Sequence, residues 1–310
     1  MSTASVERIA LYYRFAPIPD PEAVRLWQLA LCRQVGVRGR IIVSPQGING
    51  TVGGPVQAVK AYVKATREYG PFHDLEIKYS DGGLEDFPRL SVKVKPELVA
   101  FGAAERIQVT ADGVVGTGTH LRPDQVDALV AERADSERPV VFLDGRNTVE
   151  AEIGRFASAF SPGLDGASER IETTRDFLTA IDTGAFDHLR HTPVVTYCTG
   201  GVRCEILSAL LIQRGFEEVY QLDGGIVRYG ESRGDAGLWQ GELAVFDRRM
   251  ALRFSDDAET IGRCVTCQAA TSQLRNCADS ACTTLSVRCA DCATTAADWT
   301  CSVCAQAGTA

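Results

Sequence analysis

The chain of 310 residues has no apolar run approaching the roughly 20 residues that cross a membrane. Glu7 and Arg8 lie within the first ten residues and no long apolar run follows them, so a secretory signal is not expected. Hydrophobic residues make up 45% and charged residues 23%, which is ordinary for a soluble globular protein of two or three domains. These features predict a cytoplasmic protein without a membrane partner.

Disulfides are not expected in such a reducing compartment, so the 11 cysteines are interpreted as metal ligands or reactive thiols. No sequence motif for a flavin or a nucleotide is found. The net charge of −8 argues against a general nucleic-acid-binding protein. Residues 1–100 nevertheless hold 13 Lys/Arg against 10 Asp/Glu. This small excess fits a mixed solvated surface as well as it fits a nucleic-acid contact.

The segment Cys198–Cys204 carries the strongest chemical signal. It follows an apolar run, residues 193–197, that predicts a buried strand, and it precedes residues 205–216, which predict a helix ending at Gly215. A thiol on a glycine-bearing loop at such a junction faces loop amides and the positive end of the helix. Arg203 adds a positive charge, and together these effects favour the nucleophilic thiolate.

We therefore predict Cys198 as the nucleophile, with the alternative of a buried structural cysteine disfavoured by the glycines and the arginine that follow. Cys204 is expected to turn into the helix packing or to act as a secondary thiol. The predicted active-site loop consists of Thr199, Gly200, Gly201, Val202, Arg203 and Cys204.

The length of this loop distinguishes between two kinds of nucleophile. Four residues separate Cys198 from Arg203, whereas a phosphatase loop has five and cradles a tetrahedral phosphate. The shorter loop gives a smaller ring of backbone amides, which suits one extra sulfur atom on Cys198, a persulfide. The loop resembles that of rhodanese-type sulfurtransferases, and residues 140–147 and 219–226 resemble the first and closing strands of the same parallel α/β domain. Asp144 and Arg146, an Asp-x-Arg pair after a strand, are expected to brace the loop and not to react.

The first hundred residues predict a separate domain. Their residue patterns predict a strand at 8–16, a helix at 21–35, strands at 39–44 and 47–54, a helix at 55–69, and strands at 76–79 and 89–95. This β-α-β-β-α-β order is typical of the ferredoxin-like α+β fold. Cys32 is expected to pack in its core.

Eight cysteines near the carboxyl end form a second constellation, and six of them lie in three C-x-x-C knuckles. They are Cys264, Cys267, Cys277, Cys282, Cys289, Cys292, Cys301 and Cys304. This number matches two four-cysteine zinc sites, and a segment poor in large apolar residues needs such metal to fold. An iron–sulfur cluster, disulfides and a ribbon without metal are the alternatives. The pairing stays open: consecutive knuckles share an ion, or the first pairs with the third.

The complete order of motifs resembles the tRNA uridine hydroxylase family of rhodanese-like proteins. The motifs are Gly47-Ile48-Asn49-Gly50, the Cys198 loop followed by Glu205, Trp239-Gln240-Gly241, Val245-Phe246-Asp247-x-Arg249 and the Cys-rich end. The resemblance implies formation of 5-hydroxyuridine at the tRNA wobble position, dependence on molecular oxygen, and an essential cysteine at Cys198. Ile206 stands where the family commonly has Lys.

From this order we predict a ferredoxin-like domain at 1–100 that binds tRNA, a rhodanese domain at 101–235, and a linker with a Cys-rich zinc-binding region at 236–310. The resemblance implies the anticodon loop as the partner. Arg38, Arg40, Lys93 and Lys95, which flank predicted strands, are candidates to contact it. Two alternatives remain: a plain sulfurtransferase using a Cys198 persulfide, which does not need the extra domains, and a non-catalytic adaptor, which does not need the intact loop.

Overall fold

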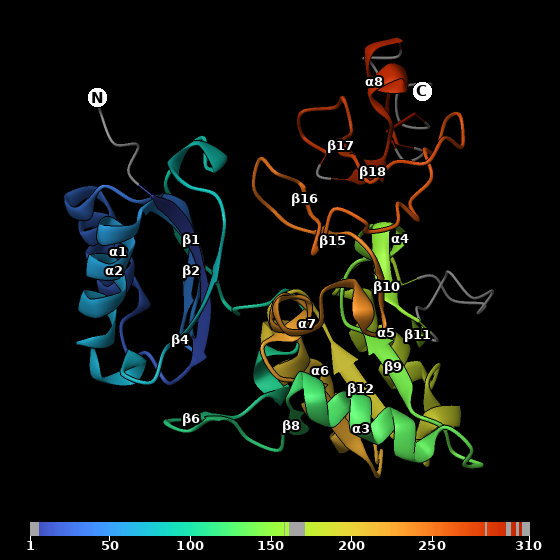
Figure 1. The fold of residues 1–310 in the computed structure, drawn as a ribbon. Coiled ribbons are helices and arrows are strands. Elements are labelled where there is room, and N and C mark those ends of the chain that lie inside the picture. Colours follow the sequence, from blue (N-terminus) through green and yellow to red (C-terminus); the bar gives the residue numbers. More distant parts are fainter. Residues whose placement is uncertain are drawn as a thin grey trace.

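The computed structural model describes residues 6–157, 159–160, 171–282, 284–295, 299–301 and 304–305. Figure 1 shows an amino-terminal domain in blue, a central domain in green and yellow, and an orange-to-red segment beyond them. In this part of the chain, no helix combines the length and the apolar character needed to cross a membrane.

The amino-terminal domain has the β-α-β-β-α-β order that the sequence predicts. Its elements are β1 (Glu7–Phe15), α1 (Pro21–Val35), β2 (Arg38–Ser44), β3 (Gly47–Pro55), α2 (Val56–Arg67), β4 (Glu76–Ser80) and β5 (Ser91–Val94). The sheet order is β4-β1-β3-β2-β5, antiparallel except for β5 beside β2. The ferredoxin-like fold is confirmed, with β5 as an added edge strand.

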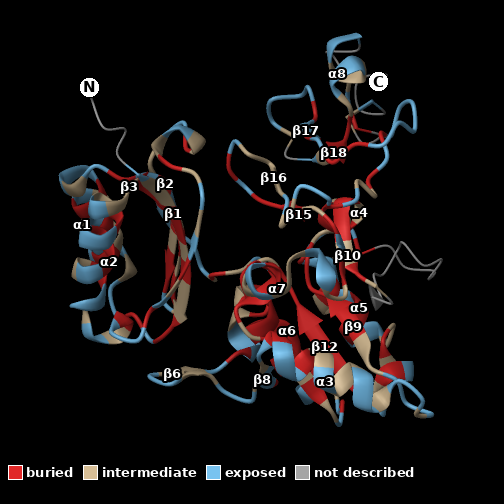
Figure 2. Cartoon of the chain, viewed as in Figure 1, coloured by how far each residue is buried: buried red, intermediate tan, exposed pale blue. Residues whose placement is uncertain are grey.

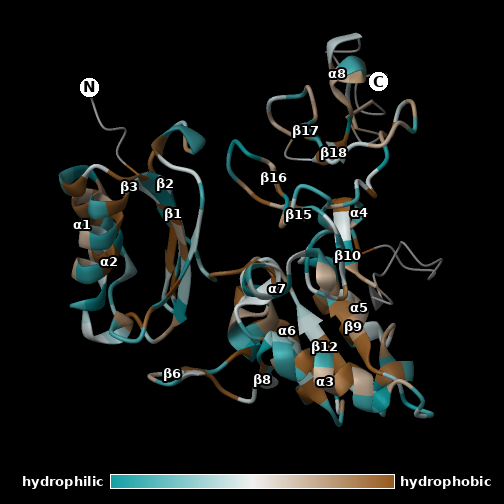
Figure 3. Ribbon diagram, in the orientation of Figure 1, coloured by the Kyte–Doolittle hydropathy of each residue, from teal (hydrophilic) through white to brown (hydrophobic). Residues whose placement is uncertain are grey.

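One face of this sheet is covered by α1 and α2 (Figure 3). The buried residues of these helices include Val24 and Leu31 of α1 and Val59 and Tyr62 of α2. Local signals explain the bounds of α1: Asp20 accepts a hydrogen bond from the Ala23 amide at 2.9 Å, Pro21 starts the helix, and Gly36 ends it at φ 81°. The core between the helices and the sheet includes Tyr12, Ile41 and Cys32, as expected for Cys32.

The central domain is built on a parallel sheet of order β11-β9-β12-β13-β8. Its strands are β8 (Thr119–Leu121), β9 (Val141–Asp144), β11 (Ala159–Phe160), β12 (Val194–Tyr197) and β13 (Val219–Leu222). Its helices are α3 (Pro123–Arg133), α4 (Thr148–Ile153), α5 (Asp176–Thr183), α6 (Val202–Gln213) and α7 (Gly225–Arg233). All four residues of β12 are buried, as is usual for a central parallel strand (Figure 2). This parallel α/β domain is the one the sequence predicts.

Short strand pairs connect and extend the two domains. They are β6 (Val109–Thr110) with β7 (Gly113–Val114), β10 (Gly154–Phe156) with β14 (Trp239–Gly241), β15 (Leu243–Ala244) with β16 (Ala251–Leu252), and β17 (Leu274–Asn276) with β18 (Leu285–Val287); α8 (Ala290–Thr295) follows. Leu274 and Val287 of the Cys-rich end form a small apolar cluster with Ile153 of α4. The Cys-rich end therefore rests on the central domain.

Candidate active site

Cys198 lies directly after β12 and has no solvent exposure. The Gly201 amide donates a hydrogen bond to Cys198 Sγ at 3.1 Å. Gly201 adopts φ +102°, a left-handed conformation that suits glycine, and caps α6. The helix begins at Val202, three residues earlier than the sequence pattern indicates, so Arg203 and Cys204 lie in its first turn. The sulfur thus faces the amino-terminal end of a helix.

The surroundings of Cys198 favour its thiolate. Burial on its own raises the pKa of this thiol, but a hydrogen bond from Cys204, the charge of Arg203 and the amides of Arg203 and Gly201 outweigh burial and lower the pKa to about 5. Burial and the neighbouring Cys198 raise the pKa of Cys204 instead. Cys204 therefore remains a thiol that donates to the Cys198 thiolate.

A buried ion pair fixes the guanidinium of Arg203. Arg203 donates two hydrogen bonds to the carboxylate of Glu150, at 2.7 and 2.9 Å, and a third to Thr199 Oγ1 at 3.1 Å. The Glu150 side chain has no exposure, and that of Arg203 is 10% exposed. Glu150 lies on α4, so this helix sets the position of the positive charge beside the sulfur.

Asp144 and Arg146 form a second buried pair at the end of β9, with contacts of 2.6 and 2.8 Å. Arg146 also donates to the Gly154 carbonyl at 2.6 Å, and its guanidinium lies over the rings of Tyr197 and Trp239 at 5.6 and 5.2 Å from their centroids. The pair ties β9 to β10 and to β12, the strand that ends at the cysteine, which is a bracing arrangement.

The first turn of α7 lies against the loop on the other side. The amides of Ile226 and Val227 donate to the carbonyls of Cys198 and Thr199 at 3.0 and 3.1 Å. Gly225, at φ +66°, allows this approach, because a Cβ there would lie 2.5 Å from the Cys198 carbonyl oxygen. The backbone of the loop is thus held on both sides.

The amino-terminal domain covers the rest of the loop, an arrangement that sequence reasoning missed. Lys78 of β4 donates from Nζ to the Gly200 carbonyl at 2.9 Å. A Cβ on Gly200 would lie 2.8 Å from Leu11 of β1, and a Cβ on Gly201 would lie 2.9 Å from Tyr13 Oη. No local pattern marks these residues, because the contacts form between strands and a loop more than 100 positions apart.

A cavity of about 260 Å³ lies where the sheet of the amino-terminal domain meets the Cys198 loop. Most of its wall is apolar. The lining combines Cys198, Thr199, Gly200, Val202 and Arg203 from the loop with Leu11, Tyr13, Arg40, Asn49, Thr51, Lys78 and Ser80 from the sheet, and with Phe246, Asp247 and Arg249 from the segment before β16. A cavity of this kind, apolar with a few convergent polar groups and a perturbed thiol, has the properties of a substrate site.

The segment between β15 and β16 forms a third side of this cavity. Arg249 donates to Asp247 Oδ1 at 2.8 Å and to Ser80 Oγ in the amino-terminal domain at 3.1 Å. The Arg248 amide donates to the Asp86 carbonyl at 3.0 Å. The Asp247-x-Arg249 motif therefore joins the two domains.

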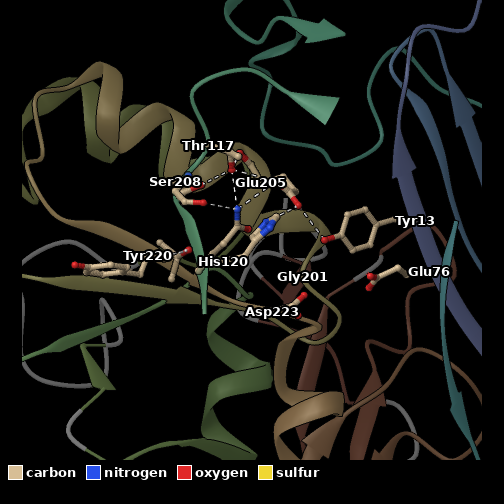
Figure 4. A network of polar contacts seen from close by, with 12 residues as sticks. Tyr13, Glu76, Thr117, His120, Gly201, Glu205, Ser208, Tyr220 and Asp223 are labelled. Atoms are coloured by element: carbon tan, nitrogen blue, oxygen red, sulfur yellow. Dashed lines mark hydrogen bonds and ion pairs between the residues drawn. The ribbon is translucent and has the colours of Figure 1, made fainter. Parts of the chain in front are cut away.

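A polar network surrounds Glu205 in the first turn of α6 (Figure 4). Its centre is the buried carboxylate of Glu205, which accepts hydrogen bonds from Tyr13 at 3.0 Å, Thr117 at 3.0 Å and Gln221 at 3.2 Å, and lies 3.1 Å from His120 Nε2. Burial raises the pKa of this carboxyl, but His120, Gln221 and Thr117 outweigh it and lower the pKa. Glu205 is therefore ionised, and its carboxylate links Tyr13 of β1 to the first turn of α6.

Three of the four residues expected to contact tRNA, Arg38, Arg40 and Lys93, share one face of the amino-terminal sheet, and Lys95 follows the end of β5. Arg40 pairs with Thr51 and with Ser91, and Ile42 pairs with Lys93, so these side chains point to the same side as the cavity. Arg38, Arg40, Lys93 and Lys95 are all exposed. Arg40 reaches the cavity itself.

The eight carboxyl-terminal cysteines gather into two groups of four, each with its sulfur atoms within 4.8 Å of one another. One group is Cys264, Cys267, Cys289 and Cys292; the other is Cys277, Cys282, Cys301 and Cys304. The first two C-x-x-C knuckles thus lie together. The Cys267–Cys289 and Cys282–Cys301 sulfur distances are both 3.7 Å, close to the edge of about 3.8 Å of a tetrahedron with Zn–S bonds of about 2.3 Å. Either group could hold a metal ion.

Comparison with known proteins covers nearly the whole chain. Family models match residues 7–98 as a UPF0176 acylphosphatase like domain, 126–232 as a rhodanese-like domain and 240–305 as a rhodanase C-terminal region. A protein of Pseudarthrobacter chlorophenolicus named tRNA uridine(34) hydroxylase is 58% identical over 91% of this chain and 93% of its own. Proteins of the same name from Kocuria rhizophila and Rhodococcus jostii are each 58% identical, over 91% and 89% of this chain and 92% and 93% of their own.

Among solved structures, a rhodanese-like domain from Anabaena sp covers 40% of this chain and 80% of its own at 17% identity, with a TM-score of 0.29. A score this low adds nothing to the fold assignment.

Proposed function

Because this chain belongs to the tRNA uridine(34) hydroxylase family, we propose that it is an oxidoreductase that hydroxylates C5 of the wobble uridine in tRNA. The observation that carries the proposal is the position of Cys198, a cysteine of depressed pKa whose loop lines a cavity that a second domain completes. A thiolate beside a cavity between two domains can react with a base bound in that cavity.

The substrate must bring its base into this cavity. An anticodon loop meets that demand, because its bases are unpaired and can be turned outward at small cost. The sheet face that borders the cavity carries Arg38, Arg40 and Lys93, and the exposed Lys95 follows β5; these side chains supply positive charge for the phosphates. In this proposal residues 1–100 bind tRNA and also complete the reaction chamber, residues 101–235 carry the nucleophile, and residues 236–310 hold the two parts together.

The chemistry requires an oxidant and a reductant. In the proposed sequence the Cys198 thiolate adds to C6 of uracil, and the electron pair of the C5=C6 bond is carried by C5 and O4. C5 takes one atom of molecular oxygen, and the other atom leaves as water with two electrons and two protons from a thiol-class reductant. Loss of the C5 proton and departure of Cys198 from C6 then restore the double bond.

The two four-cysteine groups fit zinc, since all-thiolate tetrahedral sets are typical of structural zinc sites. We propose that each group holds one ion. Four thiolates would fill the coordination sphere, so the ions would shape the Cys-rich end without taking part in the reaction. With tRNA as substrate, the expected location of the protein is the cytoplasm.

Purified protein incubated with unmodified tRNA, a thiol reductant and ¹⁸O₂ tests the proposal. Nucleoside mass spectrometry is expected to find 5-hydroxyuridine carrying ¹⁸O, and the Cys198→Ser variant is expected to form none. Incorporation of label from H₂¹⁸O and not from ¹⁸O₂ would contradict oxygen as the co-substrate. Brisk sulfur transfer from thiosulfate without any tRNA product would indicate a plain sulfurtransferase.

A further inference from the structure

Lys78 is a lysine in an unusual environment. Only 6% of its surface is exposed to solvent, although lysine is almost never buried unless it is paired. It comes from β4 of the amino-terminal domain, yet its Nζ lies 2.9 Å from the Gly200 carbonyl of the Cys198 loop and 4.9 Å from the centroid of the Tyr13 ring. The ammonium group is therefore held at the loop by a hydrogen bond and an aromatic face.

The position of Lys78 also makes it part of the cavity wall. It lines the same cavity as Cys198, and an ammonium group has three N–H donors, of which one is used by Gly200. Burial and then the charge of Arg228 lower the pKa of Lys78, and Glu76, Asp223 and the Cys198 thiolate offset this lowering only in part. A donor with no acceptor capacity thus lies beside the nucleophile.

From this geometry we propose that Lys78 donates a hydrogen bond to O4 of the target uracil and stabilises the negative charge that develops there. The inference rests on the proposed function, in which attack on C6 sends an electron pair toward C5 and O4. A preorganised donor in a water-poor site is effective at such a developing oxyanion. Lys78 is then a catalytic residue supplied by the amino-terminal domain.

The same contact would select the base. Uracil presents an acceptor oxygen at position 4, whereas cytosine presents an amino group with N–H donors at that position. An ammonium group can only donate, so it pairs with uracil and opposes cytosine. A site built to hydrogen-bond one group discriminates strongly against an analogue that leaves its donors unpaired.

A cycle that changes both partners of the contact tests the proposal. In the protein, Lys78→Met keeps a side chain of similar length and removes the N–H donors. In the RNA, 4-thiouridine replaces uridine at position 34 of an anticodon stem-loop. Sulfur is a weaker acceptor than oxygen, and any intrinsic effect of the thio group on the ring is the same with both proteins. Single-turnover rates are measured by nucleoside mass spectrometry, with Lys60→Met on the exposed side of α2 as the matched control.

We expect the thio substitution to slow the wild-type protein and Lys60→Met by about tenfold, and to leave the already slow Lys78→Met rate nearly unchanged. Lys78→Arg, which keeps a charged donor, is expected to recover part of the rate. If the rate losses from Lys78→Met and from 4-thiouridine simply multiply when both changes are combined, Lys78 does not contact O4 and the proposal is overturned.

A structural role for Lys78 is separated by a second measurement. Iodoacetamide labelling of Cys198 and stem-loop binding are both measured in Lys78→Met. We expect labelling at neutral pH and the stem-loop Kd to stay within about threefold of wild type, because Gly201, Arg203 and Cys204 still hold the sulfur. Loss of labelling together with activity would mean that Lys78 only shapes the loop. A wild-type protein that makes no hydroxyuridine would refute the proposed function itself, which is a different outcome from a cycle without coupling.

Discussion

Arg203 and Glu150 face each other across two hydrogen bonds of 2.7 and 2.9 Å, and both side chains are almost fully removed from solvent. The pair links the first turn of α6, which follows the nucleophile, to α4. It is therefore the contact through which α4 controls the electrostatics of Cys198.

Glu150→Gln is expected to destabilise the protein by about 3–5 kcal/mol, because it leaves the Arg203 guanidinium buried without its counter-charge. The double variant Glu150→Gln with Arg203→Met removes both charges and should recover part of that loss. Urea denaturation of the three proteins measures this. If Glu150→Gln alone is as stable as wild type, water or another group compensates the buried charge of Arg203.

The reactivity of Cys198 should depend on pH in a characteristic way. Since the pKa of its thiol is about 5, the rate of iodoacetamide labelling should be flat from about pH 6 to about pH 8, and it should fall below about pH 6 to half its plateau near pH 5. An ordinary thiol with a pKa near 8.5 would instead gain about tenfold per pH unit over the same range. Cys32, whose burial raises its pKa to about 12, provides the unreactive control within the same chain.

The same pKa has a consequence for stability. The folded pKa of Cys198 is lower than the unfolded value of about 8.5, so its ionisation stabilises the fold fully above about pH 8.5, and this contribution is lost as the pH falls through about 5. The difference in unfolding free energy between wild type and Cys198→Ser should therefore shrink across that window. A difference that is constant with pH would contradict the depressed pKa.

Cys204 is expected to assist and not to react. Because its thiol donates to the Cys198 thiolate, Cys204→Ala should raise the pKa of Cys198 by about one unit, and Cys204→Ser, which keeps a donor, should raise it less. Hydroxylation should fall only partly in Cys204→Ser and vanish in Cys198→Ser. Complete loss in both, with the fold intact, would indicate a Cys198–Cys204 redox pair.

Metal analysis of the purified protein should find two zinc ions per chain, one for each four-cysteine group. Chelation should unfold the Cys-rich end and, because Leu274 and Val287 cover Ile153 of α4, also lower the melting temperature of the central domain. Cys264→Ser should leave one zinc ion, with Cys32→Ser as a control that keeps both. Iron with visible absorbance would refute the zinc assignment.

The sequence predicted those parts of the molecule that depend on neighbouring residues. Strand and helix order in the amino-terminal domain follows from local periodicity, and the caps of α1 follow from Asp20, Pro21 and Gly36. The Cys198 loop was recognisable because its residues are contiguous. The start of α6 was misplaced, because the glycines that suggest a loop also cap the helix at Gly201.

The rest depends on contacts between distant segments, which carry no local signal. Lys78 and Tyr13 belong to ordinary alternating strands, and only the docking of the two domains brings them to Gly200 and Glu205. The cysteine pairing was open for a similar reason. The two groups interleave along the chain, so spacing alone does not distinguish which knuckles share an ion.

The central claim is that this protein makes 5-hydroxyuridine in tRNA through Cys198. It is tested most directly by nucleoside mass spectrometry of tRNA from cells lacking the protein, complemented with wild type or with Cys198→Ser. We predict that the modified nucleoside disappears on deletion, returns with wild type and stays absent with Cys198→Ser expressed at the same level. An unchanged amount of 5-hydroxyuridine after deletion, or full recovery with Cys198→Ser, would contradict the account.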